Sequence, residues 1–310
     1  MENLLEKLFK DKNLSEQTIS LYKRNLKKLN QNKPIKNFNY LRNIDQILDI
    51  IKDLKPTTQR SYIIAICSVL RDNIKYKKVY NQYFLLLKKF NDDLKINNQK
   101  SEKQKQNWMT KEEIQNLYET KKEDILKKID SKRKLDPSLF EELTNFVILS
   151  LYVVIQPRRN KDYSLMKISN KTEDENFNYL VGMKSRKIKP SFILNKYKTD
   201  KKYHSVHISI PDELKANIDL YLKFHPCRSK LKDENYNFYF LVDKDGNGFN
   251  KSTEITKRLN KIFDRKVSSS LLRNIFLTSK YSDVIDELKK DTQAMSTSVS
   301  TALNNYIKED

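Results

Sequence analysis

The chain has little of the residues that make tight turns, cross-links or metal clusters. It holds 3 glycines and 7 prolines among 310 residues, which favours a mostly helical chain. Its 2 cysteines, Cys67 and Cys227, are too few for a disulfide framework or a metal cluster. No apolar run reaches the roughly 18 residues that a membrane-spanning helix needs, and the first residues lack the apolar core of a secretory signal. We therefore expect a soluble, intracellular protein with no membrane partner.

Acidic residues are also scarce relative to basic ones. The chain has 61 Lys and Arg against 40 Asp and Glu, a formal net charge of +21. This excess predicts a polyanionic partner, and nucleic acid fits best. A sequence rich in Lys, Asn and Ile also arises from an AT-rich genome, and that simpler origin of the composition stays open.

The first third of the chain has a helical pattern throughout. Apolar residues recur at three- and four-residue spacing up to Leu29, behind Ser15 as a suitable N-cap. Further helices are predicted over 44–54, after Pro56 and over 76–94. This part of the chain carries about half of the net charge. We therefore predict a small basic helical bundle over 1–96 that could bind one side of a DNA duplex.

A polar segment separates this bundle from the rest of the chain. Residues 97–107 begin with ten residues that include no apolar side chain, and they are interpreted as a solvated linker. The second domain is predicted over 108–310. Thr110 and Glu113 near its start match a capping box, which predicts a helix there.

The apolar spacing changes inside the second domain. A long apolar helix is expected from Phe140 to about Ile155, His225 is expected in a loop, and helices resume from Ser252. Alternation and turn signals predict short strands at 178–182, 191–194, 206–210 and 238–242. The expected fold is mainly α with a small antiparallel β-sheet: an N-terminal helical bundle plus an α+β domain.

Arginines stand out because they are few among many lysines. A phosphodiester repels nucleophiles, and without a metal its charge is best neutralised by arginine, whose planar fork binds two phosphate oxygens at once. Arg158 and Arg159 follow the apolar helix, and Arg273 lies in a later helical segment. Lys198 precedes a predicted strand, and Tyr306 lies in an amphipathic stretch near the end.

The order and spacing of these residues resemble the tyrosine recombinase (phage-type integrase) family. That family has an Arg followed three residues later by an acid, a Lys on a hairpin, a His-x-x-Arg and a late Tyr. Here Arg159 with Asp162 matches the first element, Lys198 the second, Arg273 the third and Tyr306 the last. The resemblance covers essentially the whole chain, because the family also carries an N-terminal helical core-binding domain before its catalytic domain.

Two positions depart from the family pattern. Ser270 and Thr297 stand where the family usually has His, or His or Trp. A hydroxyl hydrogen-bonds a phosphate oxygen, but it does not take up a proton near neutral pH as imidazole does. The resemblance therefore implies that Ser270 and Thr297 orient the phosphate.

The resemblance implies a site-specific recombinase or integrase that works without metal or cofactor. Tyr306 would attack the phosphorus to give a 3′-phosphotyrosine, while Arg159 and Arg273 hold the non-bridging oxygens and Lys198 protonates the leaving 5′ oxygen. The expected partner is double-stranded DNA, with a tetramer assembled on two DNA sites. The expected location is the cytoplasm or the nucleus, wherever DNA is accessible.

Several alternatives stay open at this point. Arg158 competes with Arg159 for the first position, and Lys196, Lys201 and Lys202 compete with Lys198. A type IB topoisomerase shares the nucleophile chemistry. A DNA-binding protein with a decayed active site would also explain Ser270 and Thr297.

Overall fold

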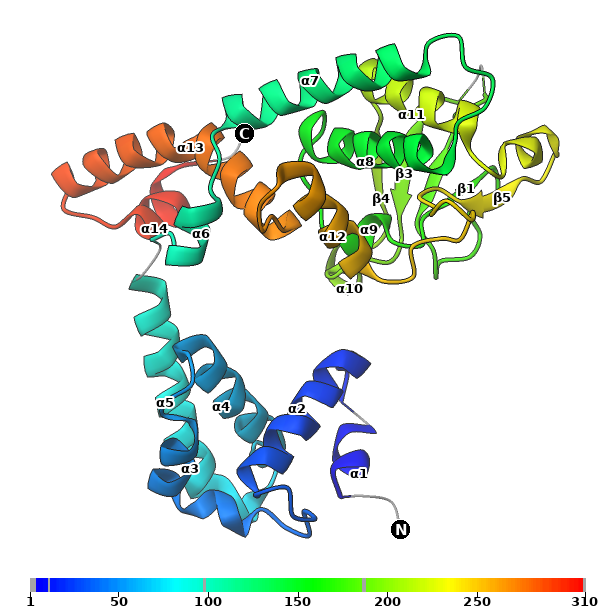
Figure 1. The fold of residues 1–310 in the computed structure, drawn as a ribbon. Helices are drawn as coiled ribbons and strands as arrows, with labels where there is room; N and C mark the ends of the chain where they lie inside the picture. Colours follow the sequence, from blue (N-terminus) through cyan, green and yellow to red (C-terminus); the bar gives the residue numbers. More distant parts are fainter. Residues whose placement is uncertain (1–3, 11, 97–98, 186–187, 309–310) are drawn as a thin grey trace. The chain divides into compact units, whose positions relative to one another are not determined.

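The chain forms two compact units, which are described separately. The computed structural model describes residues 4–10, 12–96, 99–185 and 188–308 (Figure 1). The units are Met1–Lys100 and Ser101–Asp310, so the division falls inside the predicted linker. Residues 97 and 98 of that linker lie outside the described residues.

Part of the predicted linker is helical. Helix α6 covers Glu102–Asn107 and begins with a capping box. The Ser101 hydroxyl accepts from the backbone nitrogen of Gln104 at 3.3 Å, and the Gln104 side chain accepts from the backbone nitrogen of Ser101 at 2.9 Å. These two bonds stabilise a polar helix that has no buried residue.

Within its described residues the first unit is built from helices. Ser15 caps the second of them as predicted, because its hydroxyl accepts from the backbone nitrogen of Thr18 at 3.3 Å. The core includes Leu26, Ile63 and the buried Tyr83, whose hydroxyl donates to a backbone carbonyl at 2.9 Å. The helices are α1 (Leu4–Lys10), α2 (Glu16–Leu29), α3 (Ile44–Ile51), α4 (Pro56–Leu70) and α5 (Lys77–Ile96), with 3-10 turns at Asn39–Arg42 and Ile74–Tyr76.

An apolar helix, α8, lies at the centre of the second unit. The Asp136 side chain caps it by accepting from the backbone nitrogens of Ser138 and Leu139 at 2.9 and 3.0 Å. Helix α7 begins with the predicted capping box of Thr110 and Glu113, which is confirmed by bonds of 3.1 and 2.7 Å. Helix α8 (Pro137–Val153) packs against α7 (Lys111–Ile129), α11 (Asp212–Phe224) and α12 (Ser252–Phe263).

A small mixed sheet completes the second unit, in the strand order β4-β3-β2-β1-β5. Strands β2–β3, β3–β4 and β1–β5 pair antiparallel, whereas β1 and β2 are parallel, with Lys167 opposite Tyr179. The prediction of an antiparallel sheet is therefore wrong for this pair: the chain between these strands returns to the end of the sheet from which β1 began. The strands are β1 (Lys167–Ser169), β2 (Tyr179–Val181), β3 (Ser191–Leu194), β4 (Val206–Ser209) and β5 (Asn237–Tyr239).

Helices resume after the sheet, as predicted. Helix α13 (Ser269–Ala294) begins at Ser268, whose hydroxyl accepts from the backbone nitrogen of Leu271 at 3.2 Å. A short helix α14 (Val299–Thr301) and a π-helical turn (Ala302–Tyr306) follow. None of the helices in the described ranges is long and apolar enough to cross a membrane.

His225 lies in the loop that follows α11, as predicted, and its side chain is buried there. Its Nδ1 accepts from the backbone nitrogen of Cys227 at 3.0 Å, while Nε2 has no hydrogen-bond partner in the described structure. The ring packs between Tyr221 and Phe238, with centroids 5.3 and 5.1 Å away. Burial lowers the pKa of the imidazole to about 4.

We expect His225 to weaken the fold in acid. Its folded pKa lies below its ordinary value, so the stability present above pH 6.5 is lost as the pH falls toward 4, by up to about 3 kcal/mol. His225→Gln takes up no proton, so the stability gap between wild type and variant should shrink by that amount between pH 7 and pH 4. Urea unfolding at a series of pH values measures this gap, and a gap independent of pH contradicts the assignment.

Candidate functional site

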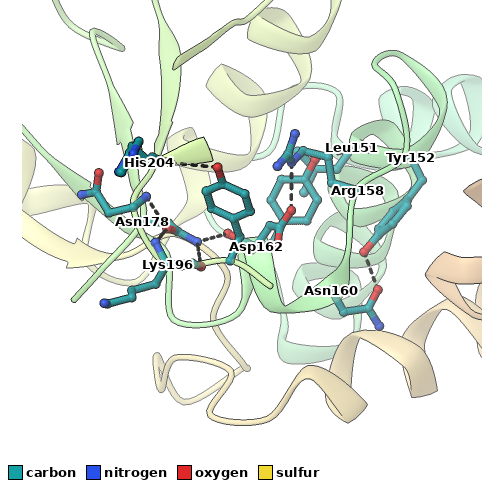
Figure 2. Close-up of polar contacts among 11 residues, drawn as sticks. Leu151, Tyr152, Arg158, Asn160, Asp162, Asn178, Lys196 and His204 are labelled. Atoms are coloured by element: carbon teal, nitrogen blue, oxygen red, sulfur yellow. Dashed lines mark hydrogen bonds and ion pairs between the residues drawn. The ribbon is translucent and has the colours of Figure 1, made fainter. Parts of the chain in front are cut away.

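Charged side chains gather where α8 ends and the short helix α9 (Asn160–Tyr163) begins. Pro157 interrupts helical hydrogen bonding there, and Arg159 is the extended N-cap residue of α9. The Arg158 Nε donates to Asp162 Oδ2 at 2.9 Å (Figure 2). The Asp162 side chain is 2% exposed and that of Arg158 is 25% exposed, so this ion pair is largely shielded from water.

This pairing separates the roles of the two neighbouring arginines. Spacing favoured Arg159 as the family's arginine because Asp162 follows three residues later, yet it is Arg158 that binds the carboxylate. The Arg159 backbone carbonyl accepts from the backbone nitrogen of Asp162 at 2.9 Å. Its guanidinium forms no hydrogen bond or ion pair with any described residue. Arg159 is therefore free to bind a ligand.

Arg273 lies one turn into α13 and is half-buried beside the same cluster. Burial and, next, the charge of Arg159 lower the pKa of its guanidinium. Asp162 acts in the opposite direction on that pKa, and Arg158 adds to the lowering. Arg273 likewise has no hydrogen bond to a described residue. Three guanidinium groups thus share one carboxylate.

Asp162 has an unusual environment for a carboxylate. Its Oδ1 is buried without a hydrogen-bond partner among the described residues. Burial raises the pKa of the Asp162 carboxyl, against the lowering effect of Arg158 and Arg159. Since Oδ2 is bound by Arg158, Asp162 serves as a structural partner that balances one positive charge of the cluster.

Buried polar bonds hold helix α9 in place. Tyr152 of α8 donates its hydroxyl proton to Asn160 Oδ1 at 2.6 Å (Figure 2). The Asn160 Nδ2 donates to the carbonyl of Ser252 at 3.1 Å and to Thr256 Oγ1 at 2.8 Å. Because Asn160 directly follows Arg159, these bonds between α8, α9 and α12 fix the backbone from which Arg159 extends.

A second buried amide, Asn178, connects the arginine turn to the chain after β3. Its Nδ2 donates to the carbonyls of Asp162 at 2.8 Å and Lys196 at 3.0 Å. Its Oδ1 accepts from the backbone nitrogens of Asn195 at 2.9 Å and Lys196 at 2.7 Å (Figure 2). Sequence reasoning missed Asn178, whose only signal is a polar residue at the start of an apolar strand.

Tyr197 positions the segment that carries Lys198. Its buried ring lies 5.8 Å from the Arg158 guanidinium carbon, and its hydroxyl donates to the carbonyl of His204 at 2.8 Å. Lys198 is exposed in the turn before helix α10 (Asp200–Tyr203). The backbone of Lys196 is held beside Asp162, while its side chain extends away from that carboxylate in Figure 2. The structure does not bring Lys198 into contact with the arginines.

The remaining predicted residues lie outside the arginine cluster. Tyr306 is 61% exposed in the last turn, and its hydroxyl bonds to no described residue. Ser270 is exposed on α13 one turn before Arg273, and so lies on the same side of the helix. Thr297 is half-buried, and its backbone nitrogen donates to the carbonyl of Thr292 at 2.9 Å. The charges of Arg159 and Arg273 thus act on each other, whereas Tyr306 has no hydrogen bond or ring contact with either arginine.

The chemistry of the site points to an anion. Two guanidinium groups from different helices lie within electrostatic reach of each other without a hydrogen-bonded partner, which suits the two non-bridging oxygens of one phosphate. In the described part of the chain, no group of three or more His, Cys, Asp or Glu is placed to hold a metal ion. No protein-family model matches the chain, and no curated protein matches it.

The two neighbouring arginines should differ in their effect on stability. Arg158→Ala leaves the buried Asp162 carboxylate unpaired and should lower the free energy of unfolding by about 3 kcal/mol. Arg159→Ala, the matched control, removes a side chain without a described partner and should change it by less than about 0.5 kcal/mol. Urea unfolding of both variants measures the difference. Equal losses would show that Arg159 also balances Asp162.

Asn178→Ala should loosen the connection after β3. The substitution removes the side-chain oxygen that accepts from the backbone nitrogens of Asn195 and Lys196, at a cost of about 2 kcal/mol in unfolding free energy. The amides of these two residues should also exchange with deuterium faster than in wild type. Asn176→Ala, at an exposed position two residues earlier, is the control and should leave both quantities unchanged. Unchanged exchange in Asn178→Ala contradicts the positioning role.

Proposed function

We propose that the chain is a DNA strand transferase of the tyrosine recombinase type, acting as a site-specific recombinase or integrase. The observation that carries the proposal is the pair of half-buried residues Arg159 and Arg273. The positive charge of Arg159 acts on the Arg273 guanidinium, and neither side chain forms an ion pair with a described carboxylate. Holding like charges together out of water is costly unless an anion joins them. A DNA phosphodiester supplies that anion, and its two free oxygens match two arginine forks.

The proposed reaction exchanges one phosphodiester bond for another. The Tyr306 oxygen attacks the phosphorus, a tyrosine–phosphorus bond forms, and the bond from phosphorus to the 5′ oxygen breaks. Lys198 gives a proton to the departing 5′ oxygen, and the phenol proton passes to water. Arg159 and Arg273 stabilise the charge that develops on the non-bridging oxygens. A 5′ hydroxyl of a partner strand then reverses the steps and rejoins the DNA.

Under this proposal Tyr306 reaches the phosphate only after DNA has bound. Tyr306 is exposed and has no hydrogen bond or ring contact with either arginine, so we propose that a movement of the last turn or a neighbouring protomer brings it to the phosphate. Joining two duplexes requires two sites and four active tyrosines. The proposed assembly is therefore a tetramer on two DNA sites, and catalysis waits until it forms.

The first unit supports the DNA part of the proposal. Its helix α2 buries Leu26 and Leu29 and exposes Arg24, Lys27 and Lys28. Basic side chains on one side of a helical bundle suit the phosphate backbone of a duplex, which fixes orientation without reading sequence. A basic helical unit followed by an α+β unit also has the order of parts of the tyrosine recombinase fold.

A second candidate is a DNA-binding protein that no longer cleaves. Two observations favour it: Tyr306 lies apart from the arginine pair, and Ser270 and Thr297 offer no imidazole for proton transfer. The phosphate site would then hold DNA without cutting it. A type IB topoisomerase would cleave by the same chemistry, but it would relax supercoiled DNA that lacks a specific site.

Trapping the covalent intermediate tests the proposal. In a nicked duplex, the short fragment that carries the free 5′ hydroxyl diffuses away after cleavage, so a tyrosine–DNA adduct should accumulate with wild type and appear on a denaturing gel. Tyr306→Phe should abolish the adduct. Tyr203→Phe, at a tyrosine 57% exposed, is the matched control and should retain it.

The outcomes separate the candidates. An adduct that persists in Tyr306→Phe would mean that another tyrosine is the nucleophile. Absence of an adduct from every protein, with DNA binding intact, would support the non-cleaving candidate. Adducts together with relaxation of DNA lacking a specific site would support the topoisomerase.

A further inference from the structure

Helix α13 is buried at its start, and after Ile275 its residues are exposed or half-buried except for the buried Thr292. Its buried apolar residues all lie between Leu271 and Ile275. Figure 1 shows the following part, in orange, projecting beyond α7 and α12. That part presents large apolar side chains to solvent: Leu277 is 50% exposed, Tyr281 40%, Val284 60% and Ile285 45%.

These side chains follow the spacing of a helix-pairing seam. Leu277, Tyr281, Val284 and the half-buried Leu288 are separated by four, three and four residues, which is the alternation of the core positions of a coiled coil. The outer side of the helix is polar, and Lys289 there pairs with Asp286 at 2.8 Å. The seam therefore suits a second helix laid along it.

The charges beside the seam select the partner and its direction. Lys280 and Glu287 occupy the same heptad position, one heptad apart, on the same edge of the seam. If two identical helices pair antiparallel, Lys280 of each faces Glu287 of the other, twice. If the two helices pair parallel, Lys280 and Glu287 of one helix lie beside the other edge of the partner helix. That edge holds Ile285 and Thr292, which carry no charge. Charge complementarity thus favours a second copy of this chain in antiparallel orientation.

The antiparallel register also pairs side chains of suitable size. Tyr281 lies opposite Val284 of the second copy, and Leu277 lies opposite Leu288. Each contact occurs twice, as the two-fold symmetry of a homodimer requires. The seam spans only about 17 Å at 1.5 Å per residue, so the contact is small and the dimer is weak when free.

We propose that α13 is a self-association surface, on which two copies pair antiparallel about a two-fold axis between Ser282 and Asp283. The proposal rests on the exposed seam and its charges and not on the strand-transfer chemistry, so the two fail independently. Two copies bound to one DNA raise each other's effective concentration, which strengthens such a weak contact.

Sedimentation velocity without DNA tests the surface, at about 0.3 M salt to screen the repulsion between two chains of net charge +21. Wild type should associate reversibly with increasing concentration, and Val284→Glu should stay monomeric. Lys280→Glu and Glu287→Lys should each weaken association by about tenfold. The double exchange, which restores the pairing, should return it to within about threefold of wild type. Asp283→Lys, off the seam, is the matched control for Glu287→Lys and should associate normally.

Disulfide trapping tests the direction. In the antiparallel register, Leu277→Cys of one chain meets Leu288→Cys of the other, so a mixture should form the mixed disulfide and neither variant alone should cross-link. Cross-linking of Leu277→Cys alone would overturn the antiparallel register. A wild-type chain that stays monomeric at all concentrations, or a double exchange that fails to restore association, would overturn the proposed surface.

Discussion

Excess positive charge around one buried carboxylate is the constraint on which the candidate site depends. Arg158, Arg159 and Arg273 lie within electrostatic reach of Asp162, and only Arg158 is paired with it. The two adjacent arginines, Arg158 and Arg159, therefore differ in whether they are paired with a carboxylate within the fold. Arg158 is paired with Asp162, whereas Arg159 and Arg273 form no ion pair with a described residue and, in the proposed function, bind the phosphate. A site that already held its own counterions would have less affinity for phosphate, because the phosphate would have to displace them.

Neutral amides hold this charged cluster in place. Asn160 joins α9 to α8 and α12, and Asn178 joins the arginine turn to the segment after β3. Both are buried and bonded through donor and acceptor atoms alike, so they position the backbone without adding charge. Asn178 thereby holds the backbone of Lys196, in the segment after β3, next to the backbone of Asp162. The side chains of Lys198 and Tyr306 form no hydrogen bond with a described residue. Under the proposed function, this cluster would hold the phosphate, and Tyr306 would have to be brought to it.

Local signals in the sequence predicted most elements of the fold. Ser15 and Thr110 cap their helices as predicted, because capping depends on residues three or fewer positions away. Strand β1 was not predicted, because three residues carry little local pattern. The strand at β2 was predicted, but its parallel pairing with β1 was not, because strand direction is decided by distant segments. The choice between Arg158 and Arg159 could not be made either, since both lie within reach of Asp162. The polar residue Asn178 at the start of an apolar strand did not reveal its role, because that role exists only once two distant segments meet.

A double-mutant cycle on DNA affinity tests the central claim that Arg159 and Arg273 bind one phosphate. Arg159→Ala, Arg273→Ala and the double variant would each be titrated with duplex DNA at one fixed salt concentration. If both arginines bind one phosphate, either single change should remove most of the contribution of the pair, so the double variant should bind little more weakly than the singles. Losses that add in full would show two independent contacts and contradict a shared phosphate site.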